Sequence, residues 1–186
     1  MVFTHDTELS LLGVAALVNT MAGSTPGDND PDRLTTVADL DAFAATWRWS
    51  GSRTHDEAEL GAVRALRPRL RELWFLDEDD AVVEVNTLLR DARALPQLVK
   101  HDDFGYHLHA TSADAPFVTR MAVEAAMAMS DVIRAGELSR LKECEPDDCD
   151  DIFIDLSKNH SRRFCDGTCG NRANVAAYRA RKAGGS

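Results

Sequence analysis

Residues 144–172 read CEPDDCDDIFIDLSKNHSRRFCDGTCGNR and contain all four cysteines of the chain. Cys144 and Cys149 enclose four residues, Cys165 and Cys169 enclose three, and fifteen residues separate the two pairs. Two close pairs joined by a short insert suit one tetrahedral ion, because each pair can wrap one side of it. The spacing therefore predicts a zinc site with these four cysteines as its ligands.

The surroundings of the cysteines favour metal binding over the alternatives, which are two disulfides, unliganded thiols or an iron–sulfur cluster. The cysteines are clustered, and nothing else in the sequence indicates export. Within the insert, the alternating run Asp151–Asp155 predicts a strand that packs Ile152 and Ile154, or Phe153, against the zinc module. So small a core depends on metal ligation for much of its folding energy.

Charge is segregated along the chain. The net charge is -10, yet residues 157–186 hold seven Lys and Arg against one Asp, whereas residues 143–156 hold seven acids and no base. This asymmetry is typical of a small anion-binding element on an acidic carrier, although a solvated basic tail gives the same pattern.

The chain before the cysteines is predicted to be mainly α-helical. Apolar residues recur at helical spacing over residues 6–21, 37–49, 54–74, 77–93 and 115–141. Thr54 and Glu57 have the spacing of a capping box at the start of the third helix. Pro68 predicts a kink or a break within that helix.

A short β-hairpin is predicted between the fourth and fifth helices, from Gln97–Lys100 and Tyr106–Thr111. His107 and His109 lie two apart in its second strand, so they share a face and could bind a metal. Histidines exposed to solvent at a sheet edge are the alternative, because the sequence offers no third ligand at a telling spacing.

Several classes of protein are excluded by the sequence. No run approaches about 18 consecutive apolar residues, and the early apolar run Leu9–Val18 follows acids rather than bases. We therefore expect neither a membrane span nor a secretory signal, and the cysteines favour the reducing cytoplasm. Four thiolates leave no open position on a zinc ion, and no catalytic motif is present, so the protein is predicted not to be an enzyme.

The block RFCDGTCGNR at residues 163–172, with Cys144 and Cys149 upstream, resembles the CGNR zinc-finger family, named after those four letters. That family usually places Trp before its third cysteine, where Phe164 retains an aromatic ring. Its members typically carry an all-helical N-terminal domain called ABATE, described as a candidate stress-induced transcription regulator. Residues 17–20, Leu-Val-Asn-Thr, are similar to the Asn-Thr signature of that domain. The resemblance implies DNA binding.

The predicted fold class is mainly α with two domains. Residues 1–142 are predicted to form an ABATE-like helical domain with a short β-hairpin. Residues 143–186 are predicted to form a small zinc module, treble-clef-like or of the knuckle type, that ends in a basic helix.

The terminal helix carries side chains that suit DNA. Asn and Arg match base edges in the major groove, and Lys and Tyr can hold phosphates. The candidate DNA-binding residues are Arg162, Arg163, Asn171, Arg172, Asn174, Tyr178, Arg179, Arg181 and Lys182. A solvated helix whose bases complement its own dipole is the alternative. Arg172 has a further alternative, which is to support a thiolate or the nearby backbone.

The sequence thus predicts a zinc-dependent transcription regulator that binds double-stranded DNA, and a homodimer would strengthen that binding. Asn19 and Thr20 either bond across the helical core or line a pocket for a small effector. The alternative function is a non-enzymatic protein-interaction module whose zinc finger is a structural plug. Exposed, convergent bases would favour DNA, whereas neutralisation of these bases by residues 143–156 would favour the plug.

Overall fold

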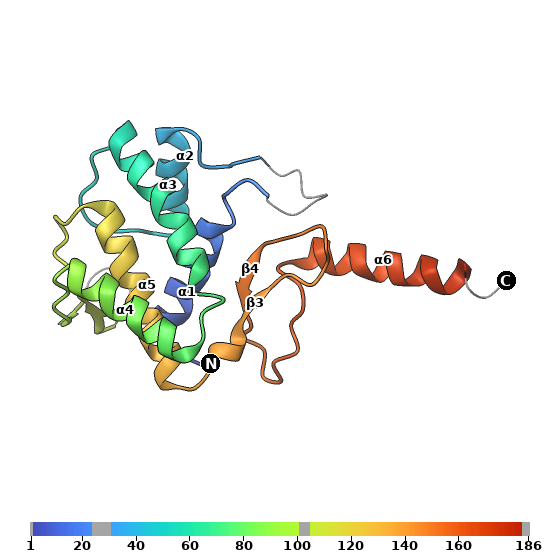
Figure 1. The fold of residues 1–186 in the computed structure, drawn as a ribbon. Helices are drawn as coiled ribbons and strands as arrows, with labels where there is room; N and C mark the ends of the chain where they lie inside the picture. The colour runs from blue at the N-terminus through green and yellow to red at the C-terminus, as the bar shows by residue number, and fades with distance from the viewer. Residues whose placement is uncertain (1, 24–30, 101–104, 184–186) are drawn as a thin grey trace.

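The computed structural model describes residues 2–23, 31–100 and 105–183, apart from the side chains of Ala180 and Ala183. Within these ranges, five α-helices precede the cysteines and form a bundle (Figure 1). They are α1 (His5–Val18), α2 (Val37–Thr46), α3 (Glu57–Glu72), α4 (Glu78–Asp91) and α5 (Phe117–Arg134). The prediction of a mainly α fold is confirmed.

Two antiparallel strand pairs accompany the helices. The predicted hairpin consists of β1 (Gln97–Val99) and β2 (His107–His109), and residues 101–104 between them lie outside the described residues. β3 (Leu141–Glu143) pairs with β4 (Ile152–Ile154). The last helix, α6 (Gly167–Ala183), projects away from the bundle (Figure 1). Across the described ranges, the search for a helix able to cross a membrane finds none.

The start of α3 differs from the prediction. Asp56 caps this helix, because its carboxylate accepts the backbone N–H of Glu59 at 2.8 Å. The Glu59 carboxylate in turn accepts the backbone N–H groups of Thr54 and His55. The helix cap is therefore shifted by two residues from the predicted Thr54, and Glu59 reaches back to the two residues before the cap rather than to the cap itself. Asp caps a helix as well as Thr does.

α3 continues through Pro68 without the predicted break. Proline cannot donate to the carbonyl four residues earlier, which belongs to Arg64. The Nε of Arg67 approaches that carbonyl at 3.5 Å. Arg67 is itself buried, and its guanidinium binds both carboxylate oxygens of Asp32 at 2.9 and 2.7 Å. This paired arginine therefore lies at the limit of hydrogen-bond distance from the carbonyl that lacks its backbone donor.

α5 ends at Arg134, although the apolar periodicity predicted a helix as far as Leu141. Gly136 follows with φ +68°, a left-handed conformation that glycine adopts at low cost. Its N–H and that of the next residue bond to carbonyls of the last helical turn, as in a glycine-terminated helix. A 3₁₀ turn (Leu138–Arg140) then leads into β3 rather than directly to the first cysteine.

One hydrophobic core joins the helices to β4. Ile152 and Ile154 are fully buried and belong to the same cluster as Leu11 of α1 and Met129 of α5. Burying a side chain of this size stabilises a fold by about 1.5–3 kcal/mol. The strand expected to pack against the zinc module is thus part of the core of the helical domain.

Asn19 joins the end of α1 to β4. Its Nδ2 donates to the carbonyl of Ile152 and its Oδ1 accepts the N–H of Ile152, both at 2.9 Å. The side-chain amide therefore pairs with the strand backbone as a neighbouring strand would. Nearby, the indole Nε1 of Trp74 donates to the carbonyl of Phe153 at 3.1 Å. These bonds hold β4 against the helical domain.

Thr20 also bonds within the protein. Its hydroxyl donates to the carbonyl of Leu17 at 2.6 Å and accepts from Nη1 of Arg67 at 2.9 Å. Both Asn19 and Thr20 therefore have the structural role that was one of the two sequence-based alternatives. These contacts do not correspond to the effector-binding alternative.

We predict that Asn19→Ala lowers the free energy of unfolding of the zinc-loaded protein by about 2 kcal/mol, because the N–H and C=O of Ile152 both lose their partner. Urea denaturation followed by circular dichroism measures the change. Asn86→Ala, at an exposed position of α4, is the matched control and should change stability little. Equal effects of the two substitutions would contradict the role assigned to Asn19.

Candidate zinc centre and nucleic-acid interface

The four cysteine thiols converge between the β3–β4 pair and the start of α6. Their Sγ atoms all lie within 4.8 Å of one another. The Sγ of Cys165 lies 3.8 Å from that of Cys149 and 3.6 Å from that of Cys169. A tetrahedral zinc ion with Zn–S bonds of about 2.3 Å places its thiolates about 3.8 Å apart. The four thiols therefore fit one zinc ion.

The two cysteine pairs come from different parts of the module. Cys144 directly follows β3, and its N–H bonds to the carbonyl of Asp151 at 2.8 Å. Cys169 lies in the first turn of α6, where Asp166 caps the helix by accepting the N–H of Cys169 at 2.8 Å. The N–H of Cys165 approaches Sγ of Cys144 at 3.2 Å and links the two halves.

The protonation of the thiols is linked to the binding of a cation. Burial raises the pKa of Cys149 to about 12, and burial is likewise the largest cause that raises the pKa of Cys144 and Cys165. Zinc binds thiolates, so its binding displaces these protons and supplies the positive charge that stabilises the buried sulfurs. Zinc affinity and proton release are consequently linked at this cluster.

Arg172 supports the thiolate cluster. Its Nη2 donates to Sγ of Cys169 at 3.2 Å, and its Nη1 pairs with the carboxylate of Asp148 at 3.0 Å. A donor to a ligating sulfur fixes the orientation of the ligand and tunes the metal. Arg172 thus supports a thiol, which was the alternative to a contact with DNA. Because it also pairs with Asp148, its charge is not free in the described structure in the way that the charges of Arg179, Arg181 and Lys182 are.

Gly170 separates the ligand Cys169 from the exposed part of α6. A Cβ atom at Gly170 would lie 3.3 Å from Cδ2 of Phe164, which is closer than about nine in ten real Cβ contacts. Phe164 therefore packs directly on the glycine backbone. Three residues of the CGNR block thus have distinct roles. Cys169 is a proposed zinc ligand, Gly170 is the surface on which Phe164 packs, and Arg172 donates a hydrogen bond to the sulfur of Cys169. Asn171 is exposed.

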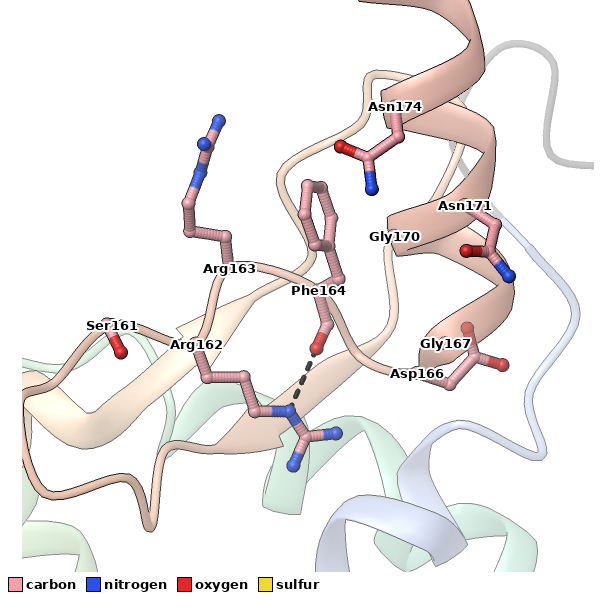
Figure 2. A pocket seen from close by; sticks show the side chains of 9 residues that line it. All are labelled: Ser161, Arg162, Arg163, Phe164, Asp166, Gly167, Gly170, Asn171 and Asn174. Carbon is pink, nitrogen blue, oxygen red and sulfur yellow. Dashed lines mark hydrogen bonds between the residues drawn. The ribbon is translucent and has the colours of Figure 1, made fainter.

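Arg162 was predicted to contact DNA, but its side chain is used within the module. Its guanidinium donates to the carbonyl of Phe164 at 2.9 Å (Figure 2). It also donates to the carbonyl of Cys165 and lies 4.8 Å above the ring of Phe153. These contacts fold the loop before α6 onto β4. A DNA contact of Arg162 stays a prediction, and the position of this arginine in the sequence did not show that its side chain is already bonded within its own loop.

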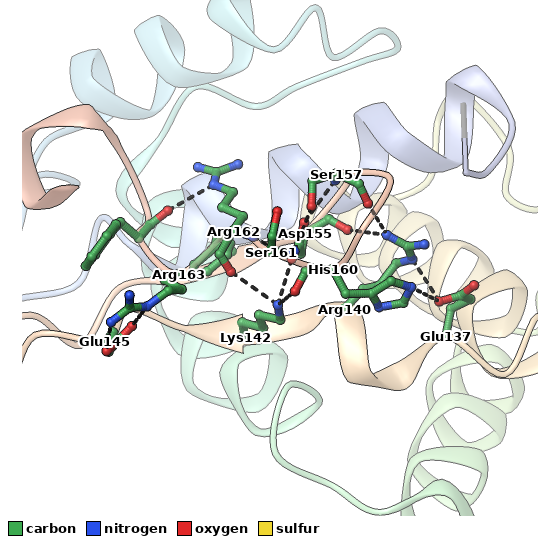
Figure 3. A network of polar contacts seen from close by, with 12 residues as sticks. Glu137, Arg140, Lys142, Glu145, Asp155, Ser157, His160, Ser161, Arg162 and Arg163 are labelled. Carbon is green, nitrogen blue, oxygen red and sulfur yellow. Dashed lines mark hydrogen bonds and ion pairs between the residues drawn. The ribbon is translucent and has the colours of Figure 1, made fainter.

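Arg163 points outward but is already paired. Its guanidinium forms a two-pronged ion pair with the carboxylate of Glu145 (Figure 3). It also lies 5.4 Å from the ring centre of Phe164. The pair is exposed, so it contributes little to stability and can exchange partners. Arg163 therefore stays a DNA candidate only if an incoming phosphate displaces Glu145.

The sequence analysis missed a polar network centred on Asp155 (Figure 3). This buried carboxylate accepts from Nζ of Lys142 at 2.6 Å and from the N–H groups of Ser157 and Arg162 at 2.9 and 3.0 Å. Burial opposes the charge, but these hydrogen bonds outweigh it and lower the pKa of Asp155. The network fixes residues 155–162, and the only signal in the sequence was the acid that closes the alternating run.

Asn171 and Asn174 border an open pocket of about 540 Å³ between the start of α6 and the preceding loop. Figure 2 shows Asn174 projecting from the helix beside the ring of Phe164 and Asn171 further from the ring, above Asp166, with Arg163 across the pocket. The amides are exposed to solvent, so they are accessible to a partner.

The rest of α6 presents its side chains to solvent. Every residue from 174 to 179 is exposed, and so are Arg181 and Lys182. Tyr178 and Val175 are 61% and 48% exposed, although both are large and partly apolar. In the described part of the chain no ion pair involves Arg179, Arg181 or Lys182. Within the described structure, three bases are thus presented on a helix that is exposed along most of its length.

Four thiols arranged for zinc on a helical domain define a zinc-finger protein, and comparison with protein families identifies the family. A family model described as "ABATE: Putative stress-induced transcription regulator" matches residues 14–136, and one described as "CGNR zinc finger" matches residues 140–182. The chain therefore belongs to the ABATE family and carries a CGNR zinc finger. A search of curated proteins finds no match. The predicted family and zinc cofactor are confirmed.

We predict one zinc ion per chain with Cys144, Cys149, Cys165 and Cys169 as its ligands. Cys169→Ser should abolish stoichiometric zinc, as measured by elemental analysis, whereas Thr168→Ser in the same helical turn should retain it. Chelation should increase hydrogen exchange in α6, while β4 stays protected because its isoleucines lie in the helical core. Full zinc content in Cys169→Ser would contradict the ligand assignment.

We predict that Arg172→Gln weakens zinc binding roughly 10-fold to 100-fold, because Cys169 loses a charged hydrogen-bond donor. Competition with a chromophoric chelator measures the affinity. Arg179→Gln, two turns further along the same exposed helix, removes the same charge without contacting a thiol and is the control. Unchanged affinity in Arg172→Gln would show that the contact with Cys169 does not support the metal.

Proposed function

We propose that this protein is a zinc-dependent transcription regulator that binds double-stranded DNA through α6. The observation that carries the proposal is the exposure of this helix beyond its first turns, together with three bases that form no ion pair in the described part of the chain. The diameter of an α-helix allows it to enter the major groove of DNA. The family description of the helical domain supports a regulatory role.

The proposed contacts follow from the chemistry of the exposed side chains. Arg179 and Lys182 are placed to bind phosphates, and Asn174 and Arg181 to read base edges, since amides match adenine and guanidinium groups match guanine. Asn171 and Tyr178 lie on the same face of the helix and complete the contact surface. Arg162 is not part of this surface, because its guanidinium is held by the loop before α6.

Few bases and an acidic carrier imply weak binding by one chain. A net charge of -10 opposes the approach to DNA, so we propose that a homodimer presents two copies of α6. A small effector at Asn19 and Thr20 is left out of the proposal, because both side chains bond within the protein. The proposed compartment is the reducing cytoplasm, where four thiolates persist. The proposal is non-enzymatic because four thiolates close the coordination shell of zinc.

The alternative is a protein-interaction module in which the zinc finger is a structural plug. Two observations favour it: β4 is embedded in the helical core, and Arg163 and Arg172 are neutralised by Glu145 and Asp148. These features concern the part of the module next to the helical domain. The exposed half of α6 is not explained by a plug, so DNA binding is the preferred function.

We predict that zinc-loaded protein binds duplexes selected from its own genome with a salt dependence of roughly -2 per chain, since two phosphate contacts each contribute about -0.9 to the slope. Fluorescence titrations at several salt concentrations measure it. Arg179→Ala or Lys182→Ala should reduce the slope by about 1 on every sequence. Asn174→Ala or Arg181→Ala should instead relax the preference at one base position, at a cost of about 1 to 3 kcal/mol.

Arg134→Ala is the matched control for these titrations. Its side chain is 81% exposed at the end of α5, so the substitution removes the same charge far from α6. If binding is absent at low salt although zinc is present, or if Arg134→Ala changes the slope as much as Arg179→Ala, the interaction-module alternative replaces DNA binding.

A further inference from the structure

The ion pair between Arg163 and Glu145 uses the guanidinium edge that also suits a phosphate. Nε and Nη2 of Arg163 each donate to a different carboxylate oxygen of Glu145. A phosphodiester likewise offers two anionic oxygens, and arginine binds either group through two parallel hydrogen bonds. The carboxylate of Glu145 therefore occupies the position on Arg163 that a DNA phosphate would take.

This ion pair is placed to exchange its acidic partner. The side chains of Arg163 and Glu145 are 64% and 49% exposed, so water and salt screen their attraction. The backbone N–H of Glu145 also donates to the carbonyl of Arg163 at 3.1 Å. Because this backbone bond is independent of the side chains, the two residues stay neighbours when the carboxylate and the guanidinium separate.

Arg172 is the other base that pairs with the acidic stretch, and its guanidinium is less replaceable. Nη2 of Arg172 contacts Sγ of Cys169 at 3.2 Å, while Nη1 pairs with Asp148 at 3.0 Å. An anion that drew Arg172 away would remove a hydrogen-bond donor from a thiol of the zinc centre. Of these two bases, Arg163 is therefore the one that an incoming phosphate can take.

The open pocket of about 540 Å³ lies beside Arg163 and has little other charge to offer a ligand. Arg162 also lines it, but its guanidinium is held by two carbonyls of its own loop. The carboxylate of Asp166 caps α6 by accepting a backbone N–H at 2.8 Å. The positive charge of Arg163 therefore makes this pocket suitable for an anion.

The pocket flanks the helix that is proposed to enter the major groove. Figure 2 shows Arg163 and Asn174 on opposite sides of the ring of Phe164. A segment that flanks a helix in the major groove lies over the sugar–phosphate backbone, where it fixes the register of the helix. We propose that Arg163 and this pocket form a third phosphate site for DNA, which Glu145 keeps closed in the wild type. This inference rests on the proposed DNA binding by α6.

Glu145 is an effective competitor because it belongs to the same chain as Arg163. An intramolecular partner acts at an effective concentration in the millimolar range, far above that of a DNA site. The wild type therefore binds DNA through the phosphate contacts of Arg179 and Lys182 alone. Closing the third site lowers the affinity for every sequence, since a phosphate contact carries no sequence information.

The test is a salt titration of the zinc-loaded full chain with duplexes selected from its own genome. Glu145→Gln should steepen the salt dependence from roughly -2 to roughly -3, because one more phosphate contact adds about -0.9 to the slope. The affinity at low salt should rise by a factor on the order of 10. Elemental analysis should show one zinc in this variant, because Glu145 adjoins Cys144.

Two further variants separate competition from a general effect of charge. Asp147→Asn is the matched control, because it removes the same charge from an exposed residue of the same stretch that forms no ion pair in the described structure. The slope should stay near that of the wild type, roughly -2. Arg163→Ala should leave the slope of the wild type unchanged and should abolish the gain when combined with Glu145→Gln.

The outcomes distinguish this inference from the proposed function. If the wild type binds DNA and Glu145→Gln leaves the slope unchanged, or if the gain persists without Arg163, the closed site is overturned and DNA binding stands. Absence of binding in every zinc-loaded variant overturns both. A measurement without DNA is the ¹⁵N spectrum of the arginine Nε–H groups, in which Glu145→Gln should shift the signal of Arg163. An unchanged signal would show that Glu145 does not hold Arg163 and would overturn the closed site alone.

Discussion

The placement of β4 within the helical core is the constraint on which the zinc module depends. Ile152 and Ile154 are buried among residues of α1 and α5, and the Asn19 amide pairs with the strand backbone. Cys149 lies just before this strand, and Cys144 follows the strand paired with it. Cys144 and Cys149 are therefore held in place by strands that pack on the helical domain. The metal would hold the second two ligands and α6 against them, together with the contacts of Arg162 and Arg172.

The positive charges that follow the acidic stretch of residues 143–156 are partly neutralised and partly exposed in the structure. Next to the zinc centre, acids from residues 143–156 pair with bases that follow: Glu145 with Arg163 and Asp148 with Arg172. These pairs close the module and hold the thiolate environment. Further along α6 no acids are within reach in the described structure, so the positive charge of the distal turns faces solvent. The acidic stretch therefore confines the exposed positive charge to the end of the helix.

The features that were predictable from sequence are local ones. Cysteine spacing identified the ligand set of the proposed zinc site, and apolar periodicity located the five bundle helices, because both depend on residues a few positions apart. Features that depend on tertiary contacts were not predictable from the sequence. Arg162 turns inward to carbonyls of its own loop, and Asn19 bonds to a residue 133 positions away. Gly136 was a local signal for the end of α5, but the apolar pattern on both sides concealed it.

The stability of α6 explains how a helix can persist without packing. Its first turn is fixed by the Asp166 cap and by Cys169 at the thiol cluster, so the costly nucleation step is already complete. Alanines at positions 173, 176 and 177 favour propagation, and Arg181 and Lys182 in the last turn complement the helix dipole. The distal bases therefore stabilise the helix that would present them to DNA. Arg181 and Lys182 can therefore stabilise the helix through its dipole and also contact DNA. Loss of zinc would weaken both roles, because the first turn that nucleates the helix would no longer be fixed.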